Sequence, residues 1–392
     1  MPGPRKLSAL APPKTLYILG AGFSIPAGAP SQAGILPEIF SLPDSTERTA
    51  QAKRALHQFL LEDLNTNPAA LHDVALEDIY TPIDRSIADN TAFRTRSHGD
   101  LSALRSDLEY LISLAIETAT RRNLRAAPRR AAYIRQFAQH VVRIAARRGE
   151  LARQGPTSEH SKRYDPLSII SLNWDILLDN ALQNALLEDN PARGDYDPFG
   201  VVDYCCYISS LNPADTRVRA GLWSLGCKGF NVKLLKLHGS MNWLQCPNCQ
   251  RLFVGFGPKL RFLERIGREN CRHCQRNGTP NTLRGSLVMP TFLKDLSNFQ
   301  IKLVWQNAGV ELREARRIVF IGYSLPYADF EFRQLLSRTI HPETAVEVVL
   351  YEGDTEQSRH AYAAEEDRYR KFLSGQQLTF HKKGVVDYID QL

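Results

Sequence analysis

No apolar run in this 392-residue sequence approaches the ~20 residues that a helix needs to span a membrane. The first 14 residues are basic, but their apolar piece is short and interrupted by prolines, so we expect no signal peptide and a frayed tail. Without a secretory signal, the seven cysteines are expected to stay reduced, because disulfides are rare in the cytoplasm. These absences favour a globular cytoplasmic protein with no membrane association.

The whole chain carries only a small excess of positive charge, with a formal net charge of +7. The excess is local, because residues 121–163 contain 12 Lys and Arg against two acids, Glu150 and Glu159, for a local net of +10. Aromatic residues are not interleaved with these basic residues, as they are in proteins that bind single-stranded nucleic acids. We therefore interpret the stretch as a solvated helix face or a contact between subunits, and keep nucleic-acid binding as the alternative.

Five apolar runs have the length and composition of buried strands. They are Thr15–Leu19, Leu167–Leu172, Val232–Leu237, Arg317–Ile321 and Val346–Tyr351. Helices are expected between them, including one over Ile176–Leu187, so the pattern predicts a parallel sheet that is covered on both faces. Ligands of such sheets bind beyond the carboxyl ends of the strands, so the residues that follow each run are the candidates for a site.

The first run leads into Gly20-Ala21-Gly22-Phe23-Ser24. Glycines after a strand let backbone amides face a phosphate, although a tight turn explains the same residues. The dinucleotide fingerprint of dehydrogenases is incomplete, because its third glycine position holds Ile25 and no strand ending in an acid follows about 20 residues later. A nicotinamide dehydrogenase is therefore disfavoured.

Polar clusters follow the other four runs. They are Asn173-Trp174-Asp175, His238-Gly239-Ser240, Gly322-Tyr323-Ser324 and Glu352-Gly353-Asp354. His238 stands between a core strand and a glycine, which favours a functional imidazole over a histidine that only packs in the core. Several such clusters at one edge of a sheet predict a binding site there.

Four of the seven cysteines form two Cys-x-x-Cys pairs, which are separated by 21 residues. The pairs are Cys246 with Cys249 and Cys271 with Cys274. Four thiolates at this spacing suit tetrahedral Zn²⁺, and a site closed by four protein ligands is structural and not catalytic. The remaining cysteines, Cys205, Cys206 and Cys227, are expected to pack as small hydrophobic residues.

Residues 41–164 differ in character, because apolar residues recur there at helical spacing and strand-like runs are scarce. We therefore expect an all-helical insertion over these residues. The expected architecture is an α/β fold in which residues 1–40, 165–245 and 285–392 form the parallel sheet and its helices, and residues 246–284 form the zinc module.

The order of five motifs resembles the sirtuin family over about two thirds of the chain. These motifs are Gly20-Ala21-Gly22-x-Ser24, Asn173-x-Asp175, His238-Gly239, the two Cys-x-x-Cys pairs, and Gly322-x-Ser324. The resemblance implies a Rossmann-like domain that binds NAD⁺, a small zinc module, and cleavage of the bond between nicotinamide and ribose.

The same resemblance implies a role for each matching residue. Gly20, Ala21, Gly22 and Ser24 would line the dinucleotide cleft, and Asn173 and Asp175 would hold the nicotinamide ribose and a water molecule. His238 would be the general base, and Gly322 and Ser324 would contact the phosphates or the adenosine side. Glu352, which follows a strand, would be a ribose ligand.

Three departures from the deacylase members of that family concern peptide recognition. Ala27-Gly28-Ala29-Pro30 is followed by Ser31-Gln32, where the deacylases have a Phe-Arg pair a few residues later. Leu172 replaces the Gln before the family's Asn, and Thr291–Lys294 stands where the deacylases receive an acyl-lysine peptide. Recognition of a peptide is therefore in doubt, whereas recognition of NAD⁺ is less affected.

The helical insertion and the run Gly-Tyr-Ser-x-Pro-x-x-Asp that ends at Asp329 resemble a prokaryotic branch of the family, whose members hydrolyse NAD⁺ in antiviral defence. The resulting hypothesis is an NAD⁺ glycohydrolase that is held silent by oligomerisation or by a partner, such as a neighbouring ATPase. The alternatives are an NAD⁺-dependent protein-lysine deacylase, and a non-catalytic sensor of NAD⁺ or ADP-ribose or a basic adaptor for nucleic acid.

Overall fold

The computed structural model describes residues 13–153, 165–189, 200–213, 229–256, 269–289, 291, 294 and 296–392. Its centre is a seven-stranded sheet in the order β11-β10-β9-β1-β2-β5-β3, in which every neighbouring pair is parallel. The strands are β1 (Thr15–Leu19), β2 (Leu167–Ser171), β3 (Gly200–Asp203), β5 (Phe230–Lys236), β9 (Arg317–Ile321), β10 (Ala345–Val349) and β11 (Leu378–His381). All five predicted runs are strands of this sheet, and the expected α/β fold is confirmed.

The chain reverses its direction of travel across the sheet beside β1. From β1 it passes to β2, then to β3 at the edge and back to β5 on one side, and it later crosses to β9, β10 and β11 on the other side. Strand β1 therefore pairs with both β2 and β9, and Thr15 lies opposite Leu167 and Arg317. Ligands of open α/β sheets bind at such a switch point, beyond the carboxyl ends of the strands.

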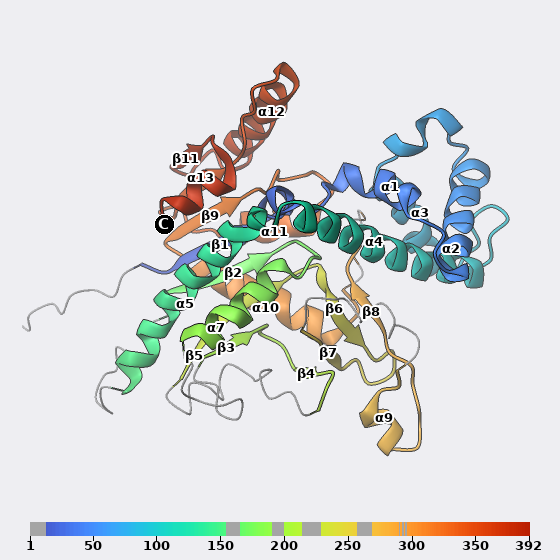
Figure 1. Ribbon diagram of the computed structural model, residues 1–392, viewed down its shortest axis with the longest axis horizontal. Helices are drawn as coiled ribbons and strands as arrows, with labels where there is room; N and C mark the ends of the chain where they lie inside the picture. The colour runs from blue at the N-terminus through green and yellow to red at the C-terminus, as the bar shows by residue number, and fades with distance from the viewer. Residues whose placement is uncertain are drawn as a thin grey trace, which may run out of the picture.

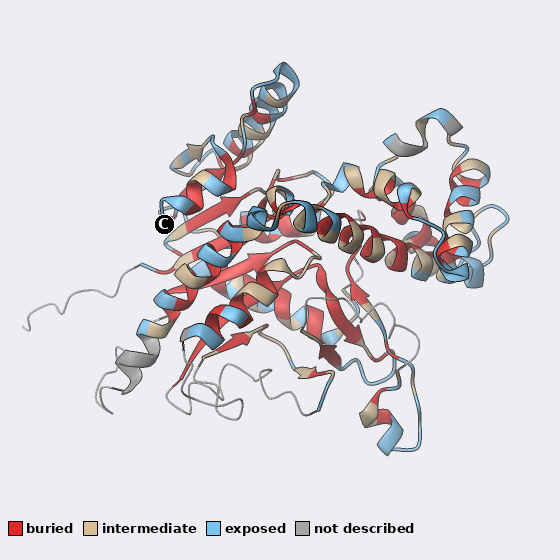
Figure 2. Cartoon of the chain, in the orientation of Figure 1, coloured by how far each residue is buried: buried red, intermediate tan, exposed pale blue. Residues whose placement is uncertain are grey.

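Helices cover both faces of the sheet, as its almost wholly buried strands require (Figures 1 and 2). On one face α5 (Ala132–Arg153) packs on α7 (Leu177–Asp189), on α13 (Gly384–Asp390) and on β2 and β5. Helices α10 (Phe299–Glu314) and α11 (Phe330–Thr339) pack on each other, and α10 packs on β5. Helix α12 (Glu356–Phe372) connects β10 to β11, and no helix among the described residues is long and apolar enough to cross a membrane.

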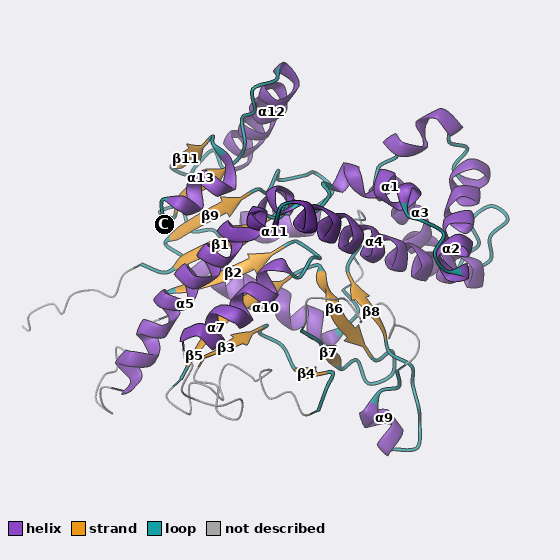
Figure 3. Ribbon diagram, viewed as in Figure 1, coloured by secondary structure: helices purple, strands orange, loops and turns teal. Residues whose placement is uncertain are grey.

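A group of helices projects from the sheet and is here called the helical module (Figure 3). Its apolar core is separate from the core under the sheet and is shared with residues of 241–289, such as Met241, Leu244 and Leu287. It consists of α1 (Gln32–Ser41), α2 (Glu47–Gln58), α3 (Leu76–Ala88) and α4 (His98–Ala126), with one irregular turn at Phe59–Asp63 and another at Pro68–Asp73. Helix α4 begins with a capping box, in which Ser97 and Asp100 each bond the other's backbone amide.

The packing groups these helices differently from the expected segment 41–164. Helix α1 begins before residue 41, yet its Ile35, Leu36 and Ile39 belong to the core of the helical module. Helix α5 lies within 41–164, yet its Phe137 and Val141 belong to the core under the sheet. By their packing, α1–α4 belong to a different core from α5, which packs under the sheet and leads into β2. The segment boundaries themselves stay predictions.

Part of the basic stretch lies on α4 and α5, and some of its charges are paired. Arg122 lies 2.7 Å from Glu38 of α1, and Arg135 lies 2.9 Å from Glu188 of α7. The end of the stretch, residues 154–163, lies outside the described residues, as do Cys227 and residues 1–12 of the frayed tail expected over residues 1–14. The expectation is wrong for Lys14, because its buried side chain pairs with Asp165 and Glu311. The local charge excess thus includes residues that bridge helices.

A second, four-stranded sheet has the order β4-β7-β6-β8, and its strand β6 follows β5 directly. Its strands are β4 (Ile208–Ser210), β6 (Gly239–Gln245), β7 (Leu252–Val254) and β8 (Arg284–Leu287), and α9 (Arg272–Arg276) lies beside them in the chain. The chain turns between the two sheets at Gly239, whose φ is 69° and where an added Cβ would lie 2.0 Å from the Ser286 carbonyl oxygen. Only glycine tolerates both that φ and that approach.

Candidate functional site

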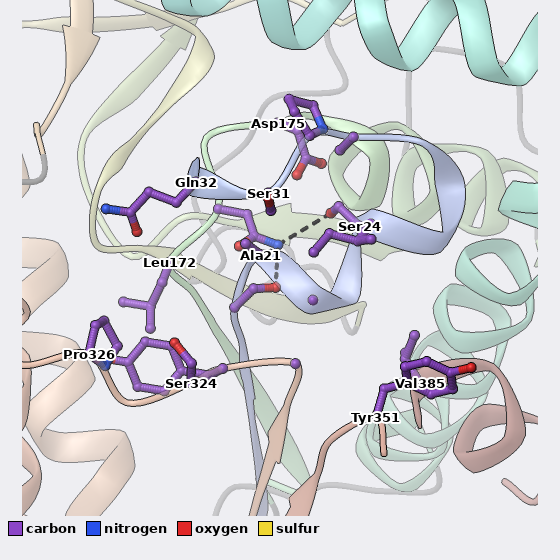
Figure 4. Close-up of a pocket in the computed structure, with 18 of the residues that line it drawn as sticks. Ala21, Ser24, Ser31, Gln32, Leu172, Asp175, Ser324, Pro326, Tyr351 and Val385 are labelled. Atoms are coloured by element: carbon purple, nitrogen blue, oxygen red, sulfur yellow. Dashed lines mark hydrogen bonds between the residues drawn. The ribbon is translucent and has the colours of Figure 1, made fainter. Parts of the chain in front are cut away.

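A cavity of about 810 Å³ opens at the switch point, beyond the carboxyl ends of β1, β2, β5, β9 and β10 (Figure 4). The predicted site residues that line it are Gly20, Ala21, Gly22, Ser24, Asn173, Asp175, His238, Gly322 and Ser324. Glu352 is not among the lining residues, because it lies beside Lys382, with a carboxylate oxygen 3.4 Å from the Nζ atom. The fold thus brings together residues that are up to 304 positions apart in the sequence, from Gly20 to Ser324.

The glycines at the cavity hold two loops in backbone contact. The amide of Gly20 donates to the Ile321 carbonyl at 3.1 Å, and the amide of Gly22 donates to the Gly322 carbonyl at 2.8 Å. A Cβ on Gly322 would lie 2.3 Å from the Gly22 carbonyl carbon, and Gly322 has a φ of 60°. Because these two amides already have acceptors, the glycines shape the cavity, and phosphate binding must use other donors.

Asn173 connects the end of β2 to the loop after β1. Its Nδ2 donates to the Gly20 carbonyl at 2.9 Å and lies 3.3 Å from Ser24 Oγ, and the residue is buried. Figure 4 draws these two bonds as dashed lines beside the labelled Ser24. With both amide hydrogens used, the Oδ1 atom remains as the acceptor that Asn173 can offer to a ligand or to water.

Asp175 is fixed at the start of α7. Its Oδ1 accepts from the Leu177 amide at 3.0 Å. Burial raises the pKa of Asp175, and the charge of Lys236 opposes that effect. Lys236 also donates to the Asp175 carbonyl at 2.6 Å and pairs with Asp179 at 3.0 Å, so a buried ammonium from β5 holds the loop that carries Asn173 and Asp175.

His238 lies in the turn between β5 and β6 and is buried, with 8% of its surface exposed. Its Nδ1 lies 3.0 Å from the Leu172 carbonyl oxygen, which can only accept, so Nδ1 carries the proton. Its Nε2 has no hydrogen-bond partner among the described residues and lies 3.6 Å from Asp329 Oδ1. Burial lowers the pKa of His238 to about 4, so the imidazole is neutral near pH 7 and presents a lone pair on Nε2.

Two charged residues beside His238 had not been assigned to the site from the sequence. Asp329 lines the cavity, and its Oδ1 lies 2.9 Å from the Nζ of Lys294, whose side chain is fully buried. The other oxygen, Oδ2, accepts from the Tyr323 hydroxyl at 2.9 Å. The run that ends at Asp329 was a usable signal. Lys294 ends the segment that stands where the deacylases receive a peptide, but that resemblance did not indicate a contact with Asp329 or His238.

The helical module supplies one wall of the cavity. Gln32 and Ile35 of α1, Glu77 of α3 and Ile116 of α4 line it, and Gln32 Nε2 donates to Glu77 Oε1 at 2.5 Å. The sequence did not predict this contribution, because helical spacing shows which face of a helix is buried and not which distant loop that helix meets.

Residues after β10 and at α13 line another part of the cavity. Tyr351 and Val385 lie together in Figure 4, and Lys383, Gly384 and Val386 also line the cavity there. Glu365 of α12 is a lining residue as well, and burial raises the pKa of its carboxyl group. A carboxylate at the cavity therefore comes from α12, where the sequence had suggested Glu352.

The four paired cysteines form one cluster. Their sulfur atoms all lie within 4.8 Å of one another, with Cys246 Sγ 3.7 Å from Cys274 Sγ and Cys249 Sγ 3.6 Å from Cys271 Sγ. These distances exceed the ~2.05 Å of a disulfide. They match the edge of a tetrahedron with Zn–S bonds of ~2.3 Å, which is about 3.8 Å. The donor set fits structural Zn²⁺, and none of the four cysteines lines the cavity.

No family model matches the sequence, and no curated protein matches it. Among solved structures, the chain is similar to two variants of a Sir2 homologue in complex with ADP-ribose, at 13% and 14% identity and TM-scores of 0.35 and 0.36. The alignments cover 96% of this chain and 92% and 89% of those chains. A third structure, described as a basis of sirtuin substrate affinity, aligns at 12% identity with a TM-score of 0.35, over 96% of this chain and 92% of that one. At these scores the superpositions say nothing about function. The functional proposal below is based on the geometry of the cavity.

Proposed function

We propose that the protein hydrolyses NAD⁺ at the bond between nicotinamide and ribose, and releases nicotinamide and ADP-ribose. The observation that supports this most is the set of acceptors in the cavity. The Nε2 of His238, the Oδ1 of Asn173 and the carboxylate of Asp175 belong to residues that line one cavity at the switch point of a Rossmann-like sheet. The cavity volume, about 810 Å³, is in the range of sites for cofactors.

The proposed reaction needs acceptors and negative charge more than it needs acids. The oxygen of water bonds to C1′ of the ribose, the C1′–N bond breaks, and its electron pair neutralises the positive ring nitrogen of nicotinamide. The water proton passes to Nε2 of His238 and then to solvent. Carboxylates near the reacting carbon stabilise the oxocarbenium-like transition state, and Asp175 and Asp329 are the candidates.

The charge of the cavity fits a ligand with a cationic part. Its described lining includes four carboxylates, Glu77, Asp175, Asp329 and Glu365, and a single lysine, Lys383. The diphosphate would therefore be bound mainly by backbone amides and by hydroxyls such as those of Ser24 and Ser324. ADP-ribose lacks the positive ring, so the same charges favour release of the product over its retention.

The test is nicotinamide release from NAD⁺ by purified protein, compared with His238→Ala and Asn173→Ala, with and without an acetyl-lysine peptide. Glu352→Gln is the control, because Glu352 lies outside the cavity lining. We expect peptide-independent release that falls at least ~100-fold in both cavity variants and is kept in the control. Release only with peptide would favour the deacylase, and NAD⁺ binding without release in every assembly state would favour the sensor.

We further propose that this activity is restrained by oligomerisation or by an activating partner such as a neighbouring ATPase, and that it serves antiviral defence by NAD⁺ depletion. An enzyme that drains NAD⁺ harms its own cell unless it is held silent. Support comes only from the resemblance of the sequence motifs. Activity measured across the fractions of a size-exclusion column tests the restraint, and equal specific activity in every assembly state would contradict it.

A further inference from the structure

Asp329 stands between two buried groups of different charge. It ends the loop after β9 and immediately precedes α11, and 8% of its surface is exposed. Its Oδ1 is 2.9 Å from Lys294 Nζ and 3.6 Å from His238 Nε2, and its Oδ2 accepts from Tyr323. The charge of Asp329 is therefore shared between an ammonium that is always present and an imidazole that can gain a proton.

In the neutral state, His238 and Asp329 face each other as two acceptors. A distance of 3.6 Å with no hydrogen between the atoms is not a hydrogen bond, and Nε2 has no other partner among the described residues. A proton on Nε2 changes this, because the imidazolium places a donor and a positive charge directly beside a carboxylate. His238 and Asp329 can therefore share a proton on Nε2 that is absent when the imidazole is neutral.

Lys294 limits how strongly Asp329 attracts that proton. Its Nζ lies 2.9 Å from Asp329, 3.8 Å from Glu331, 3.4 Å from the Ala328 carbonyl and 3.5 Å from the Thr291 carbonyl. Burial raises the pKa of Asp329, but the charge of Lys294 and the hydrogen bonds from Lys294 and Tyr323 lower it, as a protonated His238 does, so the carboxylate stays ionised. A second positive charge beside Asp329 therefore meets a carboxylate that is already partly neutralised.

We propose that Asp329 is a positioning residue that receives the charge formed when His238 takes a proton, and that Lys294 limits how strongly Asp329 attracts that proton. This inference rests on the proposed hydrolysis for its catalytic meaning. The competing explanation is that Lys294 and Asp329 form a purely structural ion pair that holds residues 291–294 to the start of α11. A purely structural pair would change folding when it is broken, but would leave kcat unchanged in a variant that folds.

The direction of each effect follows from the charges that face His238, which are Asp329 and Lys294, with Glu331 beyond Lys294. Burial lowers the pKa of His238 most, Asp329 raises it and Lys294 lowers it further. Lys294→Met removes a lowering cause, so protonation of His238 moves to higher pH. Asp329→Asn removes the raising cause, so protonation moves to lower pH.

The experiment follows the Cε1–H signal of the His238 ring by NMR as a function of pH, with the signal assigned by its loss in His238→Gln. We expect the transition of wild type near pH 4, and a rise of ~1 pH unit or more in Lys294→Met. In Asp329→Asn, which has nearly the same volume, the ring stays neutral to lower pH. Lys371→Met, which breaks an exposed pair with Asp367, is the control and leaves the transition unchanged.

Turnover of NAD⁺ supplies the second readout. Asp329→Asn should lower kcat by ~100-fold with little change in KM, because the charge formed on His238 loses its partner. Unchanged ring titration in folded Asp329→Asn and Lys294→Met would overturn the inference, and so would a downward shift in Lys294→Met. If Lys294→Met does not fold, the test uses Asp329→Asn and Lys294→Arg instead. Lys294→Arg keeps the positive charge, so the His238 titration should not shift in it. Because the ring titration needs no NAD⁺, it tests this inference even if the proposed hydrolysis fails.

Discussion

Three glycines at the cavity matter because they have no Cβ atom: Gly20, Gly22 and Gly322. A Cβ on any of them would lie less than 3 Å from the backbone of the opposite loop. Their amides and carbonyls join the loops after β1 and β9, which come together only because β1 and β9 are neighbours in the sheet. A phosphate-binding role, which Gly-x-Gly suggests from the sequence, is therefore secondary to close packing of two backbones.

We predict that Gly322→Ala lowers both stability and activity. Its φ of 60° costs an alanine about 1–2 kcal/mol, and the contact with Gly22 adds to that cost because backbone must move. The matched control is Gly278→Ala, where φ is 74° but nothing lies within 4 Å of the added Cβ. Urea unfolding should show a larger loss for Gly322→Ala, with activity reduced at least ~10-fold; equal losses in the two variants would contradict the packing role.

At the scale of elements, β5 positions the site from both of its sides. Trp305 of α10 donates to the Leu237 carbonyl at 2.9 Å, and Lys236 bonds the loop after β2. Lys236 and Asp179 are both buried, and Asp179 also accepts from the Tyr204 hydroxyl at 2.8 Å. The buried Lys236 at the end of β5 thus has a structural role, since it fixes the loop that carries Asn173 and Asp175.

We predict that Lys236→Met destabilises the protein by about 3–5 kcal/mol, because Asp179 is left as a buried charge without its counter-ion. The double variant Lys236→Met/Asp179→Leu should recover much of that loss, since both charges are then absent. The exposed pair of Lys371 and Asp367 gives the comparison, where Lys371→Met should leave stability nearly unchanged because water screens both charges. A double variant no more stable than the single one, measured by urea unfolding, would refute this account.

At the scale of the whole molecule, the two sheets are joined at the site. The Val288 amide donates to the His238 carbonyl at 2.9 Å, and the Trp174 indole donates to the Val288 carbonyl at 3.1 Å. Val288 directly follows β8, which pairs with the same β6 that leads into the cysteine turn. The cysteine cluster is therefore outside the cavity but connected through its sheet to His238 and to the loop after β2.

We predict one Zn²⁺ per chain, bound by the four clustered cysteines, and a loss of activity on its removal. Metal analysis should show that Cys271→Ser loses the zinc and melts several degrees below wild type, because the cluster ties α9 to the turn after β6. Cys206→Ser, outside the cluster, is the control and should keep its metal. Nicotinamide release that persists unchanged in metal-free protein would show that the two sheets are not coupled in this way.

Local patterns were enough to predict much of the fold and part of the site. A strand buried on both faces needs an unbroken apolar run, so all five predicted runs became strands of the parallel sheet. Short or polar strands escaped notice, since β3 (Gly200–Asp203) and β11 (Leu378–His381) have only four residues each and β6 contains Ser240 and Asn242. The spacing of the cysteines also predicted their cluster, because each Cys-x-x-Cys pair offers two thiolates from one turn.

The sequence by itself determined the parallel sheet, the cysteine cluster and the strand-end residues, because each depends on neighbours within a few positions. Only the tertiary structure decided that Lys294 and Asp329 lie beside His238, that Glu365 and not Glu352 lines the cavity, and that α1, α3 and α4 form one of its walls. Such meetings depend on how loops and helices far apart in the chain pack around the sheet, and no short-range pattern of residues encodes that packing.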